Sequence, residues 1–80
     1  MRNIIYGLVE EKYILGSEER TSYGIAAYAD YESDGTVTVV ASAHDISGDK
    51  QAVELFVDKC NKFKLSLLHF DDAVYDFLSR

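Results

Sequence analysis

The sequence predicts an α+β fold in which a three-stranded antiparallel β-meander is followed by two C-terminal α-helices packed on one sheet face, in the order β-β-β-α-α. Up to residue 43 the apolar residues alternate with polar or small ones, and after Ile46 they recur with helical spacing. Short polar segments containing Gly and Asp separate the strand-like runs, as expected for antiparallel neighbours joined by turns. A chain of 80 residues is long enough for one domain, so residues 1–80 are expected to form a single domain.

The first strand is expected over residues 4–15, which are rich in β-branched and aromatic side chains. At about 3.3 Å per residue, such a strand spans roughly 40 Å, which is long for so small a sheet. Its alternation is also broken by two adjacent apolar pairs, Leu8-Val9 and Ile14-Leu15. We therefore expect a bend or bulge near Glu10-Glu11, and a turn over Gly16–Glu19.

The second and third strands, residues 20–29 and 36–44, flank a polar turn that contains Asp34-Gly35. Alternation puts Gly24, Ala26 and Tyr28 on one face of the second strand. On the third strand, alternation puts Val37, Val39, Ala41 and Ala43 on one face. It puts Thr36, Thr38, Val40 and Ser42 on the other face. Tyr28 and Val40 are the pair expected on the sheet face that the helices leave open.

Two amphipathic helices are expected after Ile46. The apolar stripe of the first helix comprises Val53, Phe56, Val57, Cys60 and Phe63, and that of the second comprises Leu67, Phe70, Val74, Phe77 and Leu78. Ser47 and Ser66 precede these stripes and are the predicted N-caps, because a serine hydroxyl can accept a bond from an unpaired N–H of the first turn.

Two polar clusters and one cysteine are candidates for a catalytic or metal site, and a structural role explains each of them more simply. His44 and Asp45 are neighbours at a strand end, so their side chains point to opposite sides, and Ser47 has a role as a cap. His69 and Asp72 share a helix face, but two ligands on one helix are too few for a metal site unless His44 completes it. Cys60 lies on the apolar stripe and is expected to be a buried structural thiol. No catalytic residue, cofactor or metal is therefore predicted.

Composition and charge narrow the class of protein. The net charge is −6 and the basic residues are scattered, so direct binding of nucleic acid is not expected. One cysteine excludes an internal disulfide framework and fits a reducing compartment. No stretch reaches the roughly 18 apolar residues of a membrane span, and the N-terminal segment meets Glu10 too early for a signal peptide. The expected location is the cytoplasm, with no membrane contact.

Six tyrosines are many for a chain of this length. Tyrosine is enriched in interfaces because it brings a large contact area and a polar tip. The expected interaction surface is the open sheet face, with Tyr28, Val40 and Tyr31 as its residues. Tyrosines that are simply solvated on the sheet remain the alternative.

Three segments, "TSYGIAAY", "DIS" followed by Asp49, and "CNKFKLSLLHFDDAVYDFL", resemble a family of short uncharacterised proteins, a domain of unknown function, from Gram-positive anaerobic bacteria. The resemblance covers nearly the whole chain. In that family the serine equivalent to Ser66 is often followed by proline, whereas Leu67 stands there in this chain. The resemblance supports the β-β-β-α-α layout and implies no activity or ligand.

Three functional hypotheses from different classes follow. The first is a small non-enzymatic binding or regulatory protein that acts through protein–protein contacts, with an unknown protein partner or as a homodimer. The second is an inhibitor whose acids mimic a nucleic-acid backbone for a basic partner, and it requires that one continuous surface carry Glu10, Glu11, Glu18, Glu19, Asp30, Glu32 and Asp34. The third is an enzyme, which requires a concave pocket where His44 and His69 converge.

Overall fold

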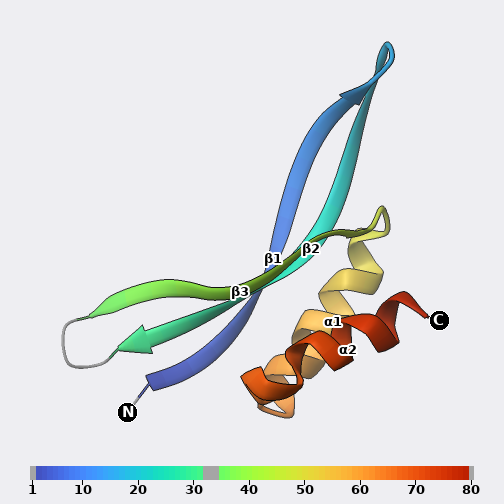
Figure 1. Cartoon of the computed structure of the whole chain (residues 1–80). Helices are drawn as coiled ribbons and strands as arrows, with labels where there is room; N and C mark the ends of the chain where they lie inside the picture. The colour runs from blue at the N-terminus through green and yellow to red at the C-terminus, as the bar shows by residue number, and fades with distance from the viewer. Residues whose placement is uncertain (1, 32–34, 80) are drawn as a thin grey trace.

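A computed structural model of the chain describes the backbone of residues 2–31 and 35–79 and the side chains of residues 4–30 and 35–79. The elements in chain order are β1 (Arg2–Leu15), β2 (Glu18–Tyr31), β3 (Thr36–Ser47), α1 (Lys50–Lys62), the 3₁₀ helix η1 (Leu67–His69) and α2 (Phe70–Leu78). The strands form one antiparallel sheet in the order β1-β2-β3, and the helices lie together on one side of it (Figure 1). The predicted α+β class and element order are confirmed.

The β1–β2 hairpin is longer than the rest of the sheet. Its pairing runs without interruption from Arg2↔Tyr31 to Leu15↔Glu18, so of the bend or bulge predicted near Glu10-Glu11 the bulge is ruled out. β3 pairs only with the half of β2 that follows Gly24, apart from one contact at Tyr23, and the remainder of the hairpin projects as a curved two-stranded arm (Figure 1). The long strand needs no bulge because its distal half does not have to fit beneath the helices.

The bulges lie in β3 instead. Ala27 pairs with Ala41, but the next β2 residue, Tyr28, pairs with Val39, so Val40 is an extra residue on β3. An extra residue shifts the alternation, and both Val40 and Ala41 pack against the core. The assignment of Val40 to the open face is therefore wrong, and Val39 stands there in its place with 55% of its surface exposed.

The core lies between the sheet and the helices. Its buried members are Tyr6, Ile25, Ala27, Ile46, Val53, Val57, Cys60, Phe70 and Val74. The Tyr6 ring on β1 stacks on the Phe70 ring of α2 with 5.8 Å between centroids, and this stack joins the last helix to the first strand. Both helices therefore pack on the same face of the sheet, as predicted.

The predicted helical stripes extend beyond the residues that the core buries. Phe63 is the C-cap of α1, and 72% of its surface is exposed. Lys64 then takes a positive φ of 51° and turns the chain away from the helix axis. Leu78 is the last residue of α2 and is 55% exposed. Both residues were assigned to buried stripes, and both lie at helix ends that pass the edge of the core.

The helix caps differ in part from the prediction. Asp49, not Ser47, is the N-cap of α1, and its Oδ1 accepts a bond from the Ala52 N–H at 3.3 Å. Ser47 ends β3, and its hydroxyl accepts a bond from the Asp49 N–H at 2.9 Å, so it supports the cap residue from outside the helix. Ser66 is confirmed as a cap, since its hydroxyl accepts from the Leu68 N–H at the start of η1.

We expect Asp49→Ala to lower the free energy of unfolding by about 1 kcal/mol, because it removes the capping acceptor and a negative charge at the positive end of the helix. Ser47→Ala should cost less than Asp49→Ala, because Ser47 does not bond to the helix itself. Urea titrations of the two variants measure the difference. A larger loss for Ser47→Ala would mean that the helix begins earlier than in this structure.

Asn61 on α1 fastens the helix to the free edge of β1. Its Nδ2 donates to the Tyr6 carbonyl and its Oδ1 accepts from the Tyr6 N–H, each at 2.8 Å. The side-chain amide therefore takes the place of a neighbouring strand at this point of the edge. The Tyr6 hydroxyl also donates to the Leu65 carbonyl at 2.7 Å, which ties the chain after α1 to the same strand.

Asn61→Asp should destabilise the protein by about 1–3 kcal/mol, because the carboxylate keeps the acceptor but sets an oxygen against the Tyr6 carbonyl in place of a donor. Hydrogen exchange of the Tyr6 amide should report local loosening. An unfolding midpoint equal to that of the wild type would show that the amide pair is dispensable.

Candidate functional site

Among the described residues, two exposed apolar surfaces are candidate contact sites. The first, the open face, is the sheet surface opposite the helices, and its central residues are Ile5, Tyr28 and Val39. The second, the interhelical groove, is a pocket between α1 and α2. Solvent-exposed apolar area of this kind marks candidate contact sites in small proteins.

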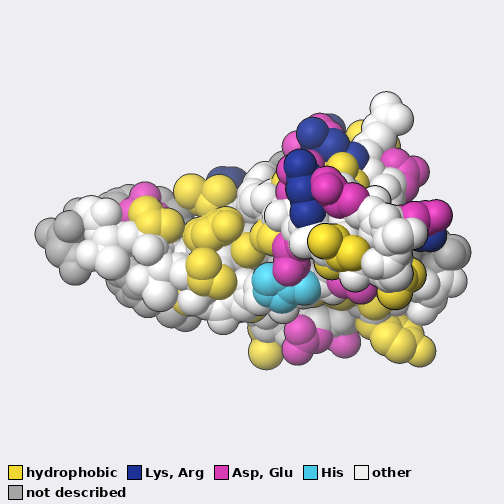
Figure 2. All heavy atoms as spheres, turned by 90° about the horizontal axis from the view of Figure 1, so that it is seen from above, with side chains coloured by type: hydrophobic (Ala, Val, Ile, Leu, Met, Phe, Trp, Pro, Cys, Tyr) yellow, Lys and Arg dark blue, Asp and Glu magenta, His cyan; other side chains and the backbone are white. Residues whose placement is uncertain are grey.

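The open face carries an apolar row that crosses all three strands. Ile5 pairs with Tyr28 across β1 and β2, and Tyr28 pairs with Val39 across β2 and β3. Ile5 is 51% exposed, Val39 is 55% exposed, and Val37, two residues along β3, is 61% exposed. Figure 2 shows hydrophobic side chains gathered along this part of the sheet, between the grey turn and a histidine. The row thus forms a continuous apolar surface rather than isolated residues.

Tyr28 lies flat on the open face. A Cβ on Gly7 would come within 3.1 Å of the Tyr28 ring, so the ring covers the position that lacks a side chain. This places Tyr28 as predicted, with its ring half-buried against β1. The side chain of Tyr31, the third residue predicted for this surface, lies outside the described residues.

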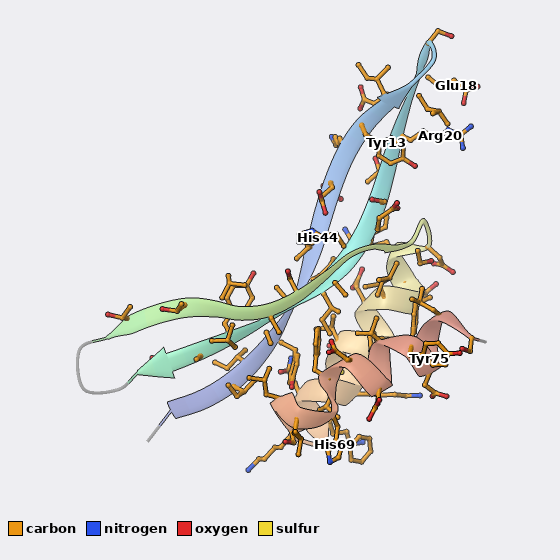
Figure 3. All side chains as sticks on the ribbon, in the orientation of Figure 1. Tyr13, Glu18, Arg20, His44, His69 and Tyr75 are labelled. Carbon is orange, nitrogen blue, oxygen red and sulfur yellow. The ribbon has the colours of Figure 1, made fainter. Side chains whose placement is uncertain are left out.

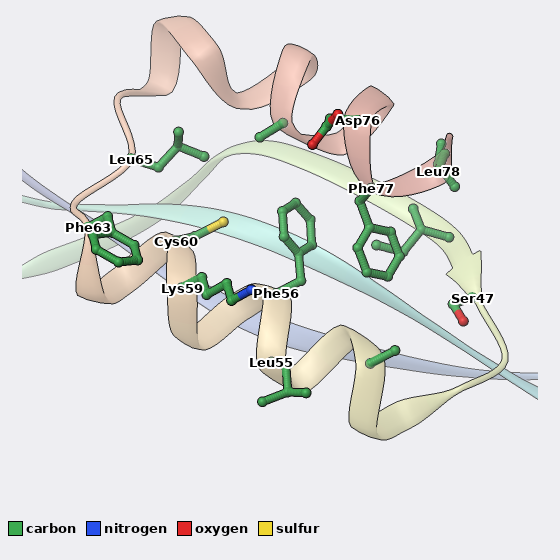
Figure 4. Close-up of a pocket in the computed structure, with 13 residues that line it drawn as sticks. Ser47, Leu55, Phe56, Lys59, Cys60, Phe63, Leu65, Asp76, Phe77 and Leu78 are labelled. Carbon is green, nitrogen blue, oxygen red and sulfur yellow. The ribbon is translucent and has the colours of Figure 1, made fainter. Parts of the chain in front are cut away.

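The interhelical groove has a volume of about 650 Å³, within the range of roughly 300–1,000 Å³ that is common for binding pockets. Stacked rings of Phe56 and Phe77, 4.8 Å apart, form its centre (Figure 4). The lining residues are Ile46, Ser47, Ala52, Leu55, Phe56, Lys59, Cys60, Phe63, Leu65, Ala73, Asp76, Phe77 and Leu78. The groove is therefore apolar, with one lysine on the α1 wall and one aspartate on the α2 wall.

The helical pattern of the sequence does not predict this groove, because it places Phe63 and Leu78 in the core. One signal was available: Leu55 is a large apolar residue that lies off the buried stripe of α1. In the structure it is 58% exposed on the rim of the groove. An apolar residue beside the stripe widens the apolar face of a helix beyond what one sheet can cover.

The polar clusters do not converge on a common site. His44 on β3 lies with its Nδ1 2.5 Å from Oε1 of Glu11 on β1. His69 is the last residue of η1, immediately before α2, and lies far from His44 (Figure 3). The pocket that the enzyme hypothesis requires, with both histidines in it, is therefore not found in the described part of the chain. Among these residues, no three His, Cys, Asp or Glu side chains are grouped closely enough to hold a metal ion.

Cys60 is buried, as predicted, at 5% exposure on the inner wall of the groove. Burial raises the pKa of the Cys60 thiol, so the reactive thiolate is scarce at neutral pH. The pKa of the Tyr6 hydroxyl is also raised, mainly by burial and to a smaller extent by the neighbouring Cys60. A raised pKa keeps the hydroxyl neutral, as its hydrogen bond to the Leu65 carbonyl requires. Both groups therefore act as structural parts of the core.

In the folded protein Cys60 should react slowly with a thiol reagent at pH 8, and in denaturant it should react at the rate of an ordinary thiol. The folded rate should increase as the pH rises toward the raised pKa of the thiol. Stopped-flow labelling with an aromatic disulfide measures both rates. Rapid labelling of the folded protein at neutral pH would return Cys60 to consideration as a nucleophile.

The acidic residues of the arm do not share one surface. Strand alternation places Glu10 and Glu19 on one side of the arm and Glu11 and Glu18 on the other. Glu18 pairs with Arg20 at 2.8 Å, and Glu11 contacts His44. Two further acids considered for this surface, Glu32 and Asp34, lie outside the described residues.

Comparison with known proteins assigns the chain to a family. A family of unknown function, DUF6514, matches residues 2–80. The chain belongs to this family. No curated protein and no solved structure matches it significantly. Membership in DUF6514 confirms the predicted resemblance to a family of unknown function. Within the described ranges, no helix has the length and apolar character needed to cross a membrane.

Proposed function

We propose that this member of DUF6514 is a small non-enzymatic binding or regulatory protein that acts through protein–protein contacts made by its open face. The partner is another protein or a second copy of the chain, and neither nucleic acid nor a membrane is required. The proposed setting is the cytoplasm of a Gram-positive anaerobic bacterium, in line with the single cysteine and the family resemblance.

The apolar row Ile5–Tyr28–Val39 carries this proposal. A sheet face that only meets water is expected to bear charged or small polar side chains at its outward positions. Here three paired outward positions, one on each strand, are apolar, and the two flanking residues of the row are more than half exposed. Tyr28, at the centre of the row, supplies a large contact area, and fixing its side chain on binding costs little conformational entropy.

The test compares two variants of equal charge change on neighbouring residues. Val39→Lys places a cation in the apolar row, whereas Thr38→Lys places one on an exposed residue that alternation directs away from the open face. Both should retain the circular dichroism of the wild type. Quantitative capture of partner protein from the native host, together with sedimentation across a concentration series, should show at least a tenfold loss of association for Val39→Lys alone.

Equal association for both lysine variants would show that the open face is only solvated. An equal loss of association in both variants would show that the added positive charge, and not its position in the apolar row, disrupts binding. The alternative function, an acidic mimic of nucleic acid, is not favoured by the arm, because its described acids are divided between two sides and two of them are paired with basic groups.

A further inference from the structure

We propose that the interhelical groove binds a second copy of this chain, and that the two copies form a symmetric dimer through their helical layers. This surface lies on the opposite side of the molecule from the open face, so the inference does not depend on the function proposed above.

Exposed apolar side chains surround the mouth of the groove. Leu55 and Phe63 on α1 and Leu78 on α2 line it, and each is more than half exposed, with Phe63 at 72%. They surround the stacked rings of Phe56 and Phe77 (Figure 4). Each copy therefore offers both a groove and apolar side chains that can fill one.

The two walls of the groove carry side chains of opposite charge. On α1, Lys59 lines the groove and Lys62 follows one turn later, with its ammonium 5.7 Å from the centre of the Phe63 ring. On α2, Asp76 lines the groove and Asp72 lies one turn earlier on the same helix face. One wall is thus basic and the other acidic.

A two-fold axis that runs along the groove brings the basic wall of each copy against the acidic wall of the other copy. Such an axis sets α1 of each protomer against α2 of its partner, at the same level along the groove. Lys59 then faces Asp72 of the partner subunit, and the contact occurs twice. Because the same charge pair forms twice, a second copy of the chain carries the charges that match both walls of the groove.

The size of the surface predicts a weak dimer. α1 has 13 residues and is therefore about 20 Å long, and two packed helices are roughly 20 Å wide. The resulting footprint of about 400 Å² is half of the ~800 Å² per partner that stable complexes bury. We therefore expect a reversible dimer with a Kd on the order of tens of micromolar or weaker.

The decisive experiment is a charge exchange across the proposed contact. Lys59→Glu alone sets acid against acid at both contacts, and Asp72→Lys alone sets base against base. Each variant alone should dissociate at least tenfold more readily than the wild type in sedimentation velocity at low salt. An equimolar mixture of the two should associate again, since each contact in the mixed dimer then joins one acid and one base.

The double variant Lys59→Glu with Asp72→Lys should also recover the homodimer, which shows that neither substitution acts by unfolding the helices. Lys12→Glu on the arm is the matched control and should leave the dimer unchanged. In the Val39→Lys background, where any association through the open face is already weakened, the same charge exchange should still dissociate and restore the dimer, which separates this inference from the proposed function. A wild type that stays monomeric at millimolar concentration, or a mixture that fails to associate, would overturn the proposal.

Discussion

Phe70→Ala should remove about 3–5 kcal/mol from the free energy of unfolding, the loss typical of a buried phenylalanine. Phe70 is 1% exposed and its ring stacks on Tyr6 of β1. It is one of the largest fully buried side chains of the core, together with Ile25 and Val53. For a chain of 80 residues, whose total stability is on the order of 4–12 kcal/mol, this loss removes a large part of the folded population.

Phe63→Ala is the matched control, because it deletes the same side chain from a position that is 72% exposed. It removes little more than a surface contact with the Lys62 ammonium, so we expect a cost below about 1 kcal/mol. Thermal and urea unfolding at low protein concentration compare the two variants without a contribution from association. Equal losses for Phe63→Ala and Phe70→Ala would show that the helical layer packs differently from this structure.

The different positions of these two phenylalanines show how far helical periodicity predicts the core. Val53, Val57, Cys60, Phe70 and Val74 recur at helical spacing, and all five are buried. Periodicity also predicted burial for Phe63, because the apolar spacing continues through it. The chain leaves the helix there through Lys64, at positive φ, and this backbone conformation leaves no mark in the apolar pattern.

The strand faces were predictable where the pairing is regular. Alternation placed Tyr28 with Gly24 and Ala26, and the register confirms that set. It failed for Val40, because a bulge changes which residues share a face and is fixed by the path of β3 rather than by residue type. The interhelical groove was not predictable for a related reason: it depends on the spacing of two helices that the sequence describes only one at a time.

The close approach of β3 to β2 explains why a glycine occupies position 24. A Cβ at this position would lie 2.3 Å from the Ala43 carbonyl oxygen and 3.0 Å from the Cα of His44. Around this point β3 uses three residues where β2 uses one, because Ile25 pairs with Ala43 while Tyr23 pairs with Ser47. Asp45 takes a positive φ of 54° within this bulge. The bulge redirects the chain from the sheet toward α1 and needs the space that Gly24 leaves.

Gly24→Ala should therefore destabilise the protein by about 3 kcal/mol, at the upper end of the usual cost of overpacking, because the obstructing atoms belong to backbone and cannot rotate away. Gly48→Ala is the control: a Cβ there meets nothing within 4 Å, and φ is not positive, so no loss is expected. Urea titration measures both, and the amides of residues 43–47 should lose hydrogen-exchange protection in Gly24→Ala alone. A variant that tolerates alanine at position 24 with unchanged protection would show that β3 does not cross β2 this closely, and the path from the sheet into α1, on which both the core and the interhelical groove depend, would then have to be redrawn.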